Sequence, residues 1–173
     1  MTTDIRLLPA QEFSLHLASL VELLQDAVDA EASVGFLPPL ATDEALEYWN
    51  GIGAALPAGQ VLLLVAEENG AVLGTVQLHL ATKANGLHRA EVSKLLVHRK
   101  AQRQGIGRRL MQAVEQLARE HKRSTLVLDT LQGAGSELLY QGLGYTAAGA
   151  IPAFARVPSG ALQPTVVYYK LLA

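Results

Sequence analysis

Hydrophobic and polar positions along this chain repeat with a period that changes between about 3.6 and 2 residues. Helical spacing predicts helices over 11–28, 43–54, 107–121 and 135–141, with Thr42 expected to cap the second. Alternating or continuous apolar runs predict strands over 5–8, 61–67, 72–80, 90–97, 125–129, 145–150 and 165–171. Asn69 and Gly70 predict a tight hairpin, and Asn85 and Gly86 mark the next turn.

The order of these segments predicts the fold class. Antiparallel strands come first and a strand-helix-strand crossover comes later, which is typical of a mixed α/β (α+β) sheet. We expect a mostly antiparallel sheet of about six to seven strands with helices on both faces. The chain has 173 residues without repeats or linkers, so a single domain over 1–173 is expected.

Composition narrows the class of protein. Half of the residues are hydrophobic and 17% are charged, which favours a compact globule. The absence of cysteine excludes disulfides, thiolate zinc sites and a cysteine nucleophile, and the histidines lack metal-ligand spacing, so no metal is expected. A net charge of -2 argues against a nucleic-acid partner. The longest apolar run, 61–66, is far shorter than the ~20 residues of a membrane span, and no apolar signal core follows Met1, so we expect a cytoplasmic protein without a membrane partner.

The segment QRQGIG, from Gln102 to Gly107, lies between a predicted strand and an amphipathic helix. Gly105 and Gly107 allow positive φ and close approach of a ligand to the backbone. The unpaired N–H groups of the first helical turn and the helix dipole favour an anion. The sequence therefore predicts a phosphate-binding loop, beside which positive charge gathers at Arg99, Lys100, Arg103, Arg108 and Arg109.

Two other kinds of phosphate loop fit less well. A nucleoside triphosphatase loop requires a Gly-Lys pair, and the chain contains none. A dinucleotide fingerprint requires a third glycine and begins directly after its strand, whereas polar residues 98–104 intervene here. Asp129 follows the glycines at roughly the sequence spacing of the acid that binds the ribose in such proteins, which keeps the dinucleotide loop as a minor alternative.

Two motifs resemble the GNAT superfamily of N-acetyltransferases. Its acetyl-CoA loop, [Q/R]-x-x-G-x-[G/A] after a strand ending L-x-V, is matched by Leu95, Val97, Gln102, Gly105 and Gly107. Its pattern A-x-x-L-Y-x-x-x-G-F is matched by SELLYQGLGY at 136–145, with Ser and Tyr replacing Ala and Phe. The resemblance covers about 60–150, which would be the coenzyme-binding core. Segments 32–36, 85–97 and those near Asp129 also resemble the tabtoxin-resistance acetyltransferases of that superfamily.

The resemblance implies acetyl-CoA as co-substrate, held between two central strands that splay apart. Departures from the superfamily pattern are Arg99, where proline is frequent, and Gly133, where asparagine is frequent. The residues that the resemblance assigns to the coenzyme are Leu95, Leu96, Val97, Gln102, Arg103, Gln104, Gly105, Ile106, Gly107 and Arg108.

Three side chains are candidates for the chemistry of acetyl transfer. Tyr140 matches the tyrosine that the superfamily uses to protonate the departing thiolate, although a core tyrosine is the alternative. Glu91 interrupts an otherwise apolar strand and is a candidate base, or an ion-pair partner of Arg89 or Lys94. Asp129 ends its strand and is a base or an ammonium ligand, or a plain strand-end carboxylate.

The acceptor side of the site is expected in the N-terminal helical region and on one strand. The candidates are Ser33, Val34, Gly35, Phe36, Trp49 and His79, with a core role equally open for Trp49. The resemblance implies transfer to the primary amine of a small molecule, an amino-acid-like metabolite or an antibiotic. A protein or peptide N-acetyltransferase and a non-catalytic acyl-CoA sensor are the alternatives, and a homodimer is one option for assembly.

Overall fold

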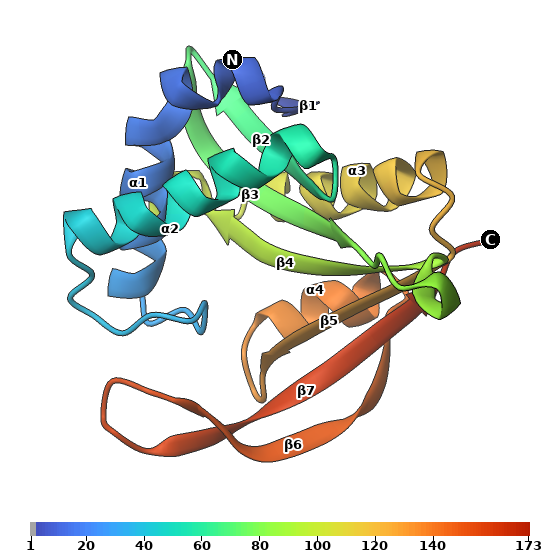
Figure 1. The fold of residues 1–173 in the computed structure, drawn as a ribbon. Helices are drawn as coiled ribbons and strands as arrows, with labels where there is room; N and C mark the ends of the chain where they lie inside the picture. Colours follow the sequence, from blue (N-terminus) through green and yellow to red (C-terminus); the bar gives the residue numbers. More distant parts are fainter. Residues whose placement is uncertain (1–2) are drawn as a thin grey trace.

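A computed structural model describes residues 3–173 and contains, within them, one seven-stranded sheet in the order β1-β2-β3-β4-β5-β7-β6 (Figure 1). The strands are β1 (Asp4–Leu7), β2 (Val61–Glu68), β3 (Ala71–Leu80), β4 (Arg89–Val97), β5 (Thr125–Leu131), β6 (Thr146–Arg156) and β7 (Leu162–Leu171). The helices are α1 (Phe13–Asp29), α2 (Thr42–Ala55), α3 (Ile106–Glu120) and α4 (Ser136–Gly142), with short 3₁₀ turns at Ala10–Glu12, Leu56–Ala58, Ala84–Gly86 and Arg99–Ala101.

The central pair of strands, β4 and β5, creates the opening that matters for function. Every other neighbouring pair is antiparallel, whereas β4 and β5 run parallel. Their pairing covers only three positions, from Arg89 opposite Thr125 to Glu91 opposite Val127. Beyond Glu91 the strands diverge, as Figure 1 shows. The predicted mixed, mostly antiparallel and splayed sheet is therefore confirmed.

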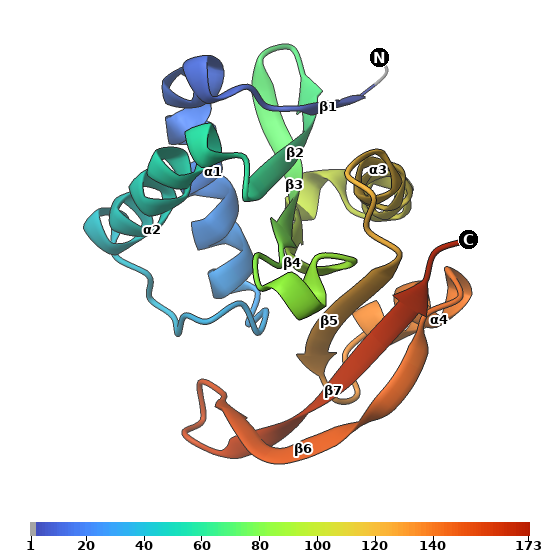
Figure 2. The same cartoon turned by 45° about the vertical axis from the view of Figure 1, so that its right-hand side comes forward.

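Helices cover both faces of the sheet (Figure 2). On one face, α1 and α2 bury Leu20, Leu24 and Trp49 against β2 and β3. On the other face, α3 buries Leu110 and Val114, whose spacing of four places them on one side of the helix. The burial of these apolar stripes fixes both layers on the sheet, at roughly 1.5–3 kcal/mol for each large side chain.

The hairpin signal read from the sequence is confirmed. Asn69 has φ 52° and Gly70 has φ 81°, the two positive values that a tight type I′ turn requires. The Asn85 and Gly86 turn is the short 3₁₀ segment Ala84–Gly86. Most predicted helices and strands end within two residues of the observed ends.

Two local predictions were wrong. Thr42 does not cap α2: Ala41 occupies the N-cap position, and Thr42 Oγ1 instead accepts a hydrogen bond from Gln25 Nε2 at 3.2 Å. The sixth strand was predicted over 145–150 but continues to Arg156, because its pairing with β7 resumes at Ala155 after an irregular stretch that contains Pro152.

Candidate active site

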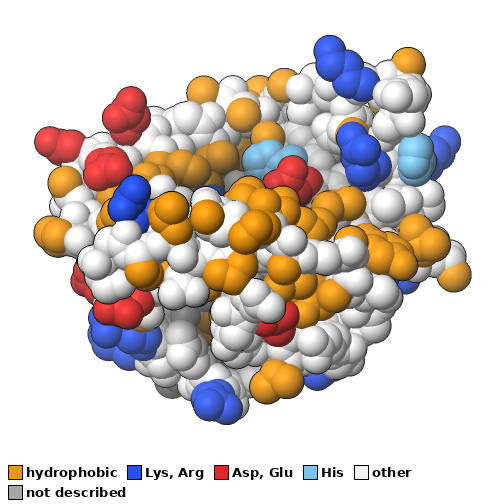
Figure 3. All heavy atoms as spheres, turned by 90° about the horizontal axis from the view of Figure 1, so that it is seen from below, with side chains coloured by type: hydrophobic (Ala, Val, Ile, Leu, Met, Phe, Trp, Pro, Cys, Tyr) orange, Lys and Arg blue, Asp and Glu red, His pale blue; other side chains and the backbone are white. Residues whose placement is uncertain are grey.

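A cleft of about 880 Å³ opens where β4 and β5 diverge. Its inner walls are residues 92–95 of β4 and 129–131 of β5, with Tyr140 of α4 between them. Its outer walls are residues 30–38, which connect α1 to α2, and residues 154–158 near the tip of the β6–β7 hairpin. Figure 3 views the molecule from below and shows apolar side chains spread over the middle of this face, with most charged side chains toward its margins.

The wall formed by β4 contains a β-bulge. Ser93 pairs with Gln77 and Leu96 pairs with Thr75, so β4 carries one more residue than β3 across this stretch. Lys94, within the bulge, has φ 51°, and its carbonyl accepts a hydrogen bond from Thr75 Oγ1 at 3.1 Å. The bulge interrupts strand alternation beside the cleft, so consecutive residues 92–95 all line it.

The predicted phosphate loop lies between β4 and α3 and has the required backbone. Gly105 is the N-cap of α3 with φ 78°, and Arg103 also has positive φ, at 63°. No side chain caps the helix, so its first N–H groups remain available to a ligand. A Cβ built on Gly105 would meet no atom within 4 Å, so the space in front of the loop is open. These features fit the pyrophosphate of coenzyme A.

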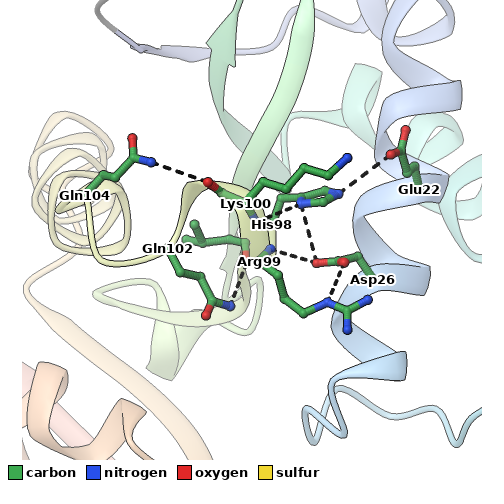
Figure 4. A network of polar contacts seen from close by, with 8 residues as sticks. Glu22, Asp26, His98, Arg99, Lys100, Gln102 and Gln104 are labelled. Atoms are coloured by element: carbon green, nitrogen blue, oxygen red, sulfur yellow. Dashed lines mark hydrogen bonds and ion pairs between the residues drawn. The ribbon is translucent and has the colours of Figure 1, made fainter.

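The loop is attached to α1 by a polar network (Figure 4). Asp26, 9% exposed, accepts hydrogen bonds from the backbone N–H of Arg99 at 2.9 Å and from its Nε at 2.7 Å. His98 lies between Asp26 and Glu22, at 3.7 Å from each carboxylate. Burial raises the pKa of the Asp26 carboxyl, but the two hydrogen bonds from Arg99 and the neighbouring positive charges together outweigh burial, and the pKa lies below its ordinary value.

Hydrogen bonds within the loop complete its shape. Gln102 Nε2 donates to the carbonyl of Val97 at 3.1 Å, and Gln104 Nε2 donates to that of Lys100 at 3.4 Å. Both amide side chains therefore fold back on the chain, as Figure 4 shows. Ile106 is 2% exposed, so only its backbone can reach a ligand.

The positive charges near the loop have different environments. Arg99 is bound to Asp26, and Arg109 donates to the carbonyl of Thr3 at 2.8 Å. Arg108 reaches the carbonyl of Gly142 at 3.5 Å and so lies between α3 and α4. Two of the five positively charged side chains beside the loop, Arg99 and Arg109, are therefore engaged by other groups of the protein.

Tyr140 lines the cleft from α4 and is 7% exposed. Among residues 3–173, no hydrogen bond involves its hydroxyl group, although the ring packs against Tyr145 and Tyr168 at centroid distances of 5.9 and 6.0 Å. Burial, with a smaller contribution from the charge of Asp129, raises the pKa of Tyr140 to about 12. The phenol therefore keeps its proton throughout the neutral range, and its hydroxyl group has no hydrogen-bond partner in the part of the chain that the structure describes.

The two candidate bases have different positions. Asp129 lines the cleft, and its Oδ2 accepts a hydrogen bond from Thr165 Oγ1 at 2.8 Å. Glu91 is exposed at the last position where β4 pairs with β5 and is absent from the cleft lining. It lies opposite His79 of β3. The structure therefore places Asp129, and not Glu91, in the same cleft as Tyr140.

A chain of hydrogen-bonded side chains, of which only His79 was predicted from the sequence, extends inward from His79, the residue opposite Glu91. His79 Nε2 lies 3.0 Å from Gln77 Oε1, and Gln77, 1% exposed, donates from Nε2 to the Tyr48 hydroxyl at 2.9 Å. Burial lowers the pKa of His79, and the charge of Glu91 opposes that shift. Burial also raises the pKa of Tyr48 to about 12. Polar residues at alternate positions of β3 were the only sequence signal for this chain.

The predicted acceptor residues are only partly brought together. Ser33, Val34, Gly35 and Phe36 all line the cleft. Trp49 is completely buried in the core, so the alternative core role holds and it does not wall the acceptor site. His79 is absent from the lining and is bound to Gln77.

The splayed sheet with a loop at the N-terminus of α3 agrees with the comparison with known proteins. The sequence model of the acetyltransferase (GNAT) family matches residues 21–145, and the chain belongs to this family. Similar folds occur in the ribosomal-protein-alanine N-acetyltransferase of Brucella melitensis (22% identity, TM-score 0.80, covering 98% of this chain and 99% of that one) and an N-acetyltransferase of Staphylococcus aureus Mu50 (20%, 0.81, 100% and 100%). Another is yncA of Salmonella typhimurium, solved with its cofactor acetyl-CoA (24%, 0.79, 100% and 95%).

Two further features are absent from residues 3–173. None of the helices in this part of the chain is both long and apolar enough to cross a membrane. Within the same residues, no group of three or more histidine or acidic side chains is arranged to hold a metal ion.

Proposed function

We propose that this protein transfers the acetyl group of acetyl-CoA to the primary amine of a small molecule, by direct attack while both substrates are bound. The observation that carries the proposal is the position of Asp129 and the free hydroxyl group of Tyr140 in one cleft between splayed strands. The residues of the loop from Gln102 to Arg108 would hold the phosphates, and the unpaired edge of β4 near Leu95, Leu96 and Val97 would bind the pantetheine arm.

Bound acetyl-CoA would supply an activated thioester in this cleft. Asp129, oriented by Thr165, is placed to accept the proton that an ammonium group must lose before it can attack. Tyr140 is placed to give a proton to the departing sulfur. A phenol with a pKa of about 12 always carries that proton, although its raised pKa reduces the driving force for transfer in comparison with an ordinary tyrosine.

Glu91 remains a second candidate base. Glu91 lies where the pairing of β4 with β5 ends, and its side chain is outside the lining of the cleft. It could therefore act only through an intervening group or water. Its charge influences both His79 and Lys94. His79 is therefore the side chain through which Glu91 would be connected to the interior.

The size and walls of the cleft support a small acceptor. Ligand pockets in proteins measure about 300–1,000 Å³, and this cleft of about 880 Å³ would contain the pantetheine arm as well as the acceptor. Residues 30–38 and 154–158 enclose the acceptor side, where a peptide would need an extended groove. The resemblance to tabtoxin-resistance acetyltransferases also supports an amino-acid-like metabolite or antibiotic as acceptor.

An acceptor screen with detection of the released thiol tests the proposal. Purified protein and acetyl-CoA are incubated with small amines, with peptides and without acceptor. Thiol release that depends on a small amine, with the acetylated amine identified by mass spectrometry, supports the proposal. Release only with peptides would favour a peptide acetyltransferase. Tight acetyl-CoA binding without turnover on any acceptor would favour a sensor.

A further inference from the structure

Lys94 is a charged side chain of the cleft that the proposed mechanism does not use. It lies in the bulge of β4 and lines the cleft beside Val92, Ser93 and Leu95. Its Nζ lies 5.5 Å from the centre of the Tyr48 ring, and a Cβ built on Gly35 would lie 4.0 Å from that nitrogen. The ammonium group is therefore held between α2, the segment before α2 and the open space of the cleft.

The positive charge of this ammonium group is only partly compensated by the groups around it. Among residues 3–173, no hydrogen bond or ion pair is made by Lys94 Nζ. The ring of Tyr48 compensates only part of a buried positive charge. Burial lowers the pKa of Lys94, and the charges of Asp129 and Glu91 oppose that shift. A half-buried cation without a counter-ion at contact distance would be stabilised by an anionic ligand.

Asp129 presents the opposite charge from the opposite wall. It belongs to β5, whereas Lys94 belongs to β4, and both line the same cleft. The charge of Asp129 acts on Lys94, but among residues 3–173 the two side chains do not form an ion pair. Thr165 holds the carboxylate of Asp129 by a hydrogen bond of 2.8 Å. The divergence of β4 and β5 thus separates the positive group of Lys94 from the negative group of Asp129. This arrangement is complementary to a zwitterion.

We infer that the acceptor carries a carboxylate close to its reactive amine, as an α-amino acid does, and that Lys94 binds this carboxylate while the amine lies at Asp129. The inference rests on the proposed function and specifies the substrate class of the same cleft. Coenzyme phosphates do not require Lys94, because the loop at the N-terminus of α3 is separately suited to them. The bulge thereby has a role in selecting the acceptor.

The test compares α-amino acids with their primary amides, which keep the amine and the side chain but lack the carboxylate. Lys94→Met removes the charge and keeps most of the stem, Lys94→Arg keeps the charge, and Lys83→Met is the control at an exposed lysine outside the cleft. Specificity, kcat/KM, is measured for each pair. Dividing the acid-to-amide ratio of wild type by that of each variant cancels the different basicities of the amines.

We expect Lys94→Met to lower kcat/KM for acids by about 10- to 100-fold, the usual range for losing one charge-assisted contact. The amides should change by less than about threefold, Lys94→Arg should retain part of the preference, and Lys83→Met should match wild type. The affinity for acetyl-CoA should be unchanged in all variants. Equal loss for acids and amides, or no loss, would overturn the role of Lys94 while transfer to small amines still upheld the proposed function.

A binding measurement keeps the two proposals separate. Melting temperatures of the acetyl-CoA-bound protein are recorded with each acid and with its amide. Stabilisation of wild type by acids alone, lost in Lys94→Met, supports the carboxylate site even if no acceptor turns over and the proposed function fails. Stabilisation that does not differ between acids and amides, or that persists in Lys94→Met, contradicts the site.

Discussion

Asp26 in α1 holds Arg99, the second residue after β4, through two hydrogen bonds across 73 positions of sequence. One bond comes from the backbone N–H of Arg99 at 2.9 Å and the other from its Nε at 2.7 Å. Since the phosphate loop begins three residues later at Gln102, this contact fixes where the loop leaves the sheet. The helix α1, which leads into the proposed acceptor wall, thereby helps to position the proposed coenzyme loop.

Asp26→Asn should weaken both the fold and coenzyme binding. We expect a loss of about 1–3 kcal/mol in unfolding free energy, because charge-assisted bonds to a buried carboxylate are removed, and a several-fold higher KM for acetyl-CoA with smaller change in kcat. Thermal unfolding and steady-state kinetics measure the two effects. Asp29→Asn, at an exposed position at the end of the same helix, is the control. An unchanged KM would show that the contact is structural only.

The stability difference between wild type and Asp26→Asn should depend on pH in one direction. The folded pKa of Asp26 lies below its ordinary value of about 3.9, so the carboxylate stabilises the fold fully above that value. The contribution is lost as pH falls toward the folded pKa. The difference should therefore be largest above about pH 5 and shrink below about pH 4, measured by denaturant titrations at each pH. A difference that grows on acidification would contradict this assignment.

Gly105→Val should abolish coenzyme binding while the protein remains folded. A Cβ at this position meets no atom within 4 Å, but φ of 78° is unfavourable for a β-branched residue by about 1–2 kcal/mol, and the side chain would occupy the space a phosphate needs. Gly59→Val is the matched control, since Gly59 also has positive φ and open space but lies far along the chain, after α2. Calorimetric titration with acetyl-CoA should detect binding only in the control.

A structural feature could be predicted when the residues that form it are consecutive in the sequence. Gly105 and the strand and helix around it are consecutive, so their pattern predicted the loop before its φ of 78° was known. The hairpin at Asn69 and Gly70 was predicted for the same reason. Asp26 could not be found in this way, because a helical acid becomes informative only when its partner, 73 residues away, folds onto it.

The acceptor side was predicted less well. Burial of Trp49 depends on how α1 and α2 pack together, and a tryptophan on an amphipathic helix has the same pattern in a core and in a pocket wall. The bulge at Lys94 adds one residue to β4 without a glycine or proline to mark it. Its opening of consecutive side chains to the cleft was therefore invisible in the alternation of the strand.

The variant Tyr140→Phe distinguishes a catalytic role of the hydroxyl group from a packing role of the aromatic ring. The hydroxyl group makes no hydrogen bond within residues 3–173, so its removal should leave the melting temperature nearly unchanged. If Tyr140 donates the proton, kcat should fall by about 10² or more while acetyl-CoA affinity stays intact. With a pKa of about 12, Tyr140 should also produce no basic limb in the pH-rate profile below about pH 10. Normal kcat would remove Tyr140 from the mechanism.

Another prediction concerns the ion pair between Glu115 of α3 and Lys170 of β7, which contributes to the stability of the fold. Lys170 Nζ donates to Glu115 Oε2 and to the carbonyl of Leu143, both at 2.7 Å, and Glu115 is 6% exposed. Lys170→Met leaves a buried carboxylate without its partner and should destabilise the fold by about 3–5 kcal/mol. The double variant Glu115→Leu with Lys170→Met should recover most of that loss. Denaturant unfolding of both variants decides this, and equal losses would contradict it.

Asp129→Asn and Glu91→Gln should separate the two candidate bases. Asp129 lines the cleft and is oriented by Thr165, whereas Glu91 lies outside the lining. We therefore expect Asp129→Asn to lower kcat by about 10²–10⁴ and to remove the acidic limb of the pH-rate profile, and Glu91→Gln to change kcat by less than about tenfold. If Asp129 only binds the ammonium group, Asp129→Asn would instead raise KM with kcat nearly unchanged.

The control is Glu47→Gln, which changes an exposed carboxylate on α2 outside the cleft lining and should behave as wild type. The reverse ranking of the two variants would make Glu91 the base, acting through His79, and wild-type profiles for both would exclude each from proton transfer.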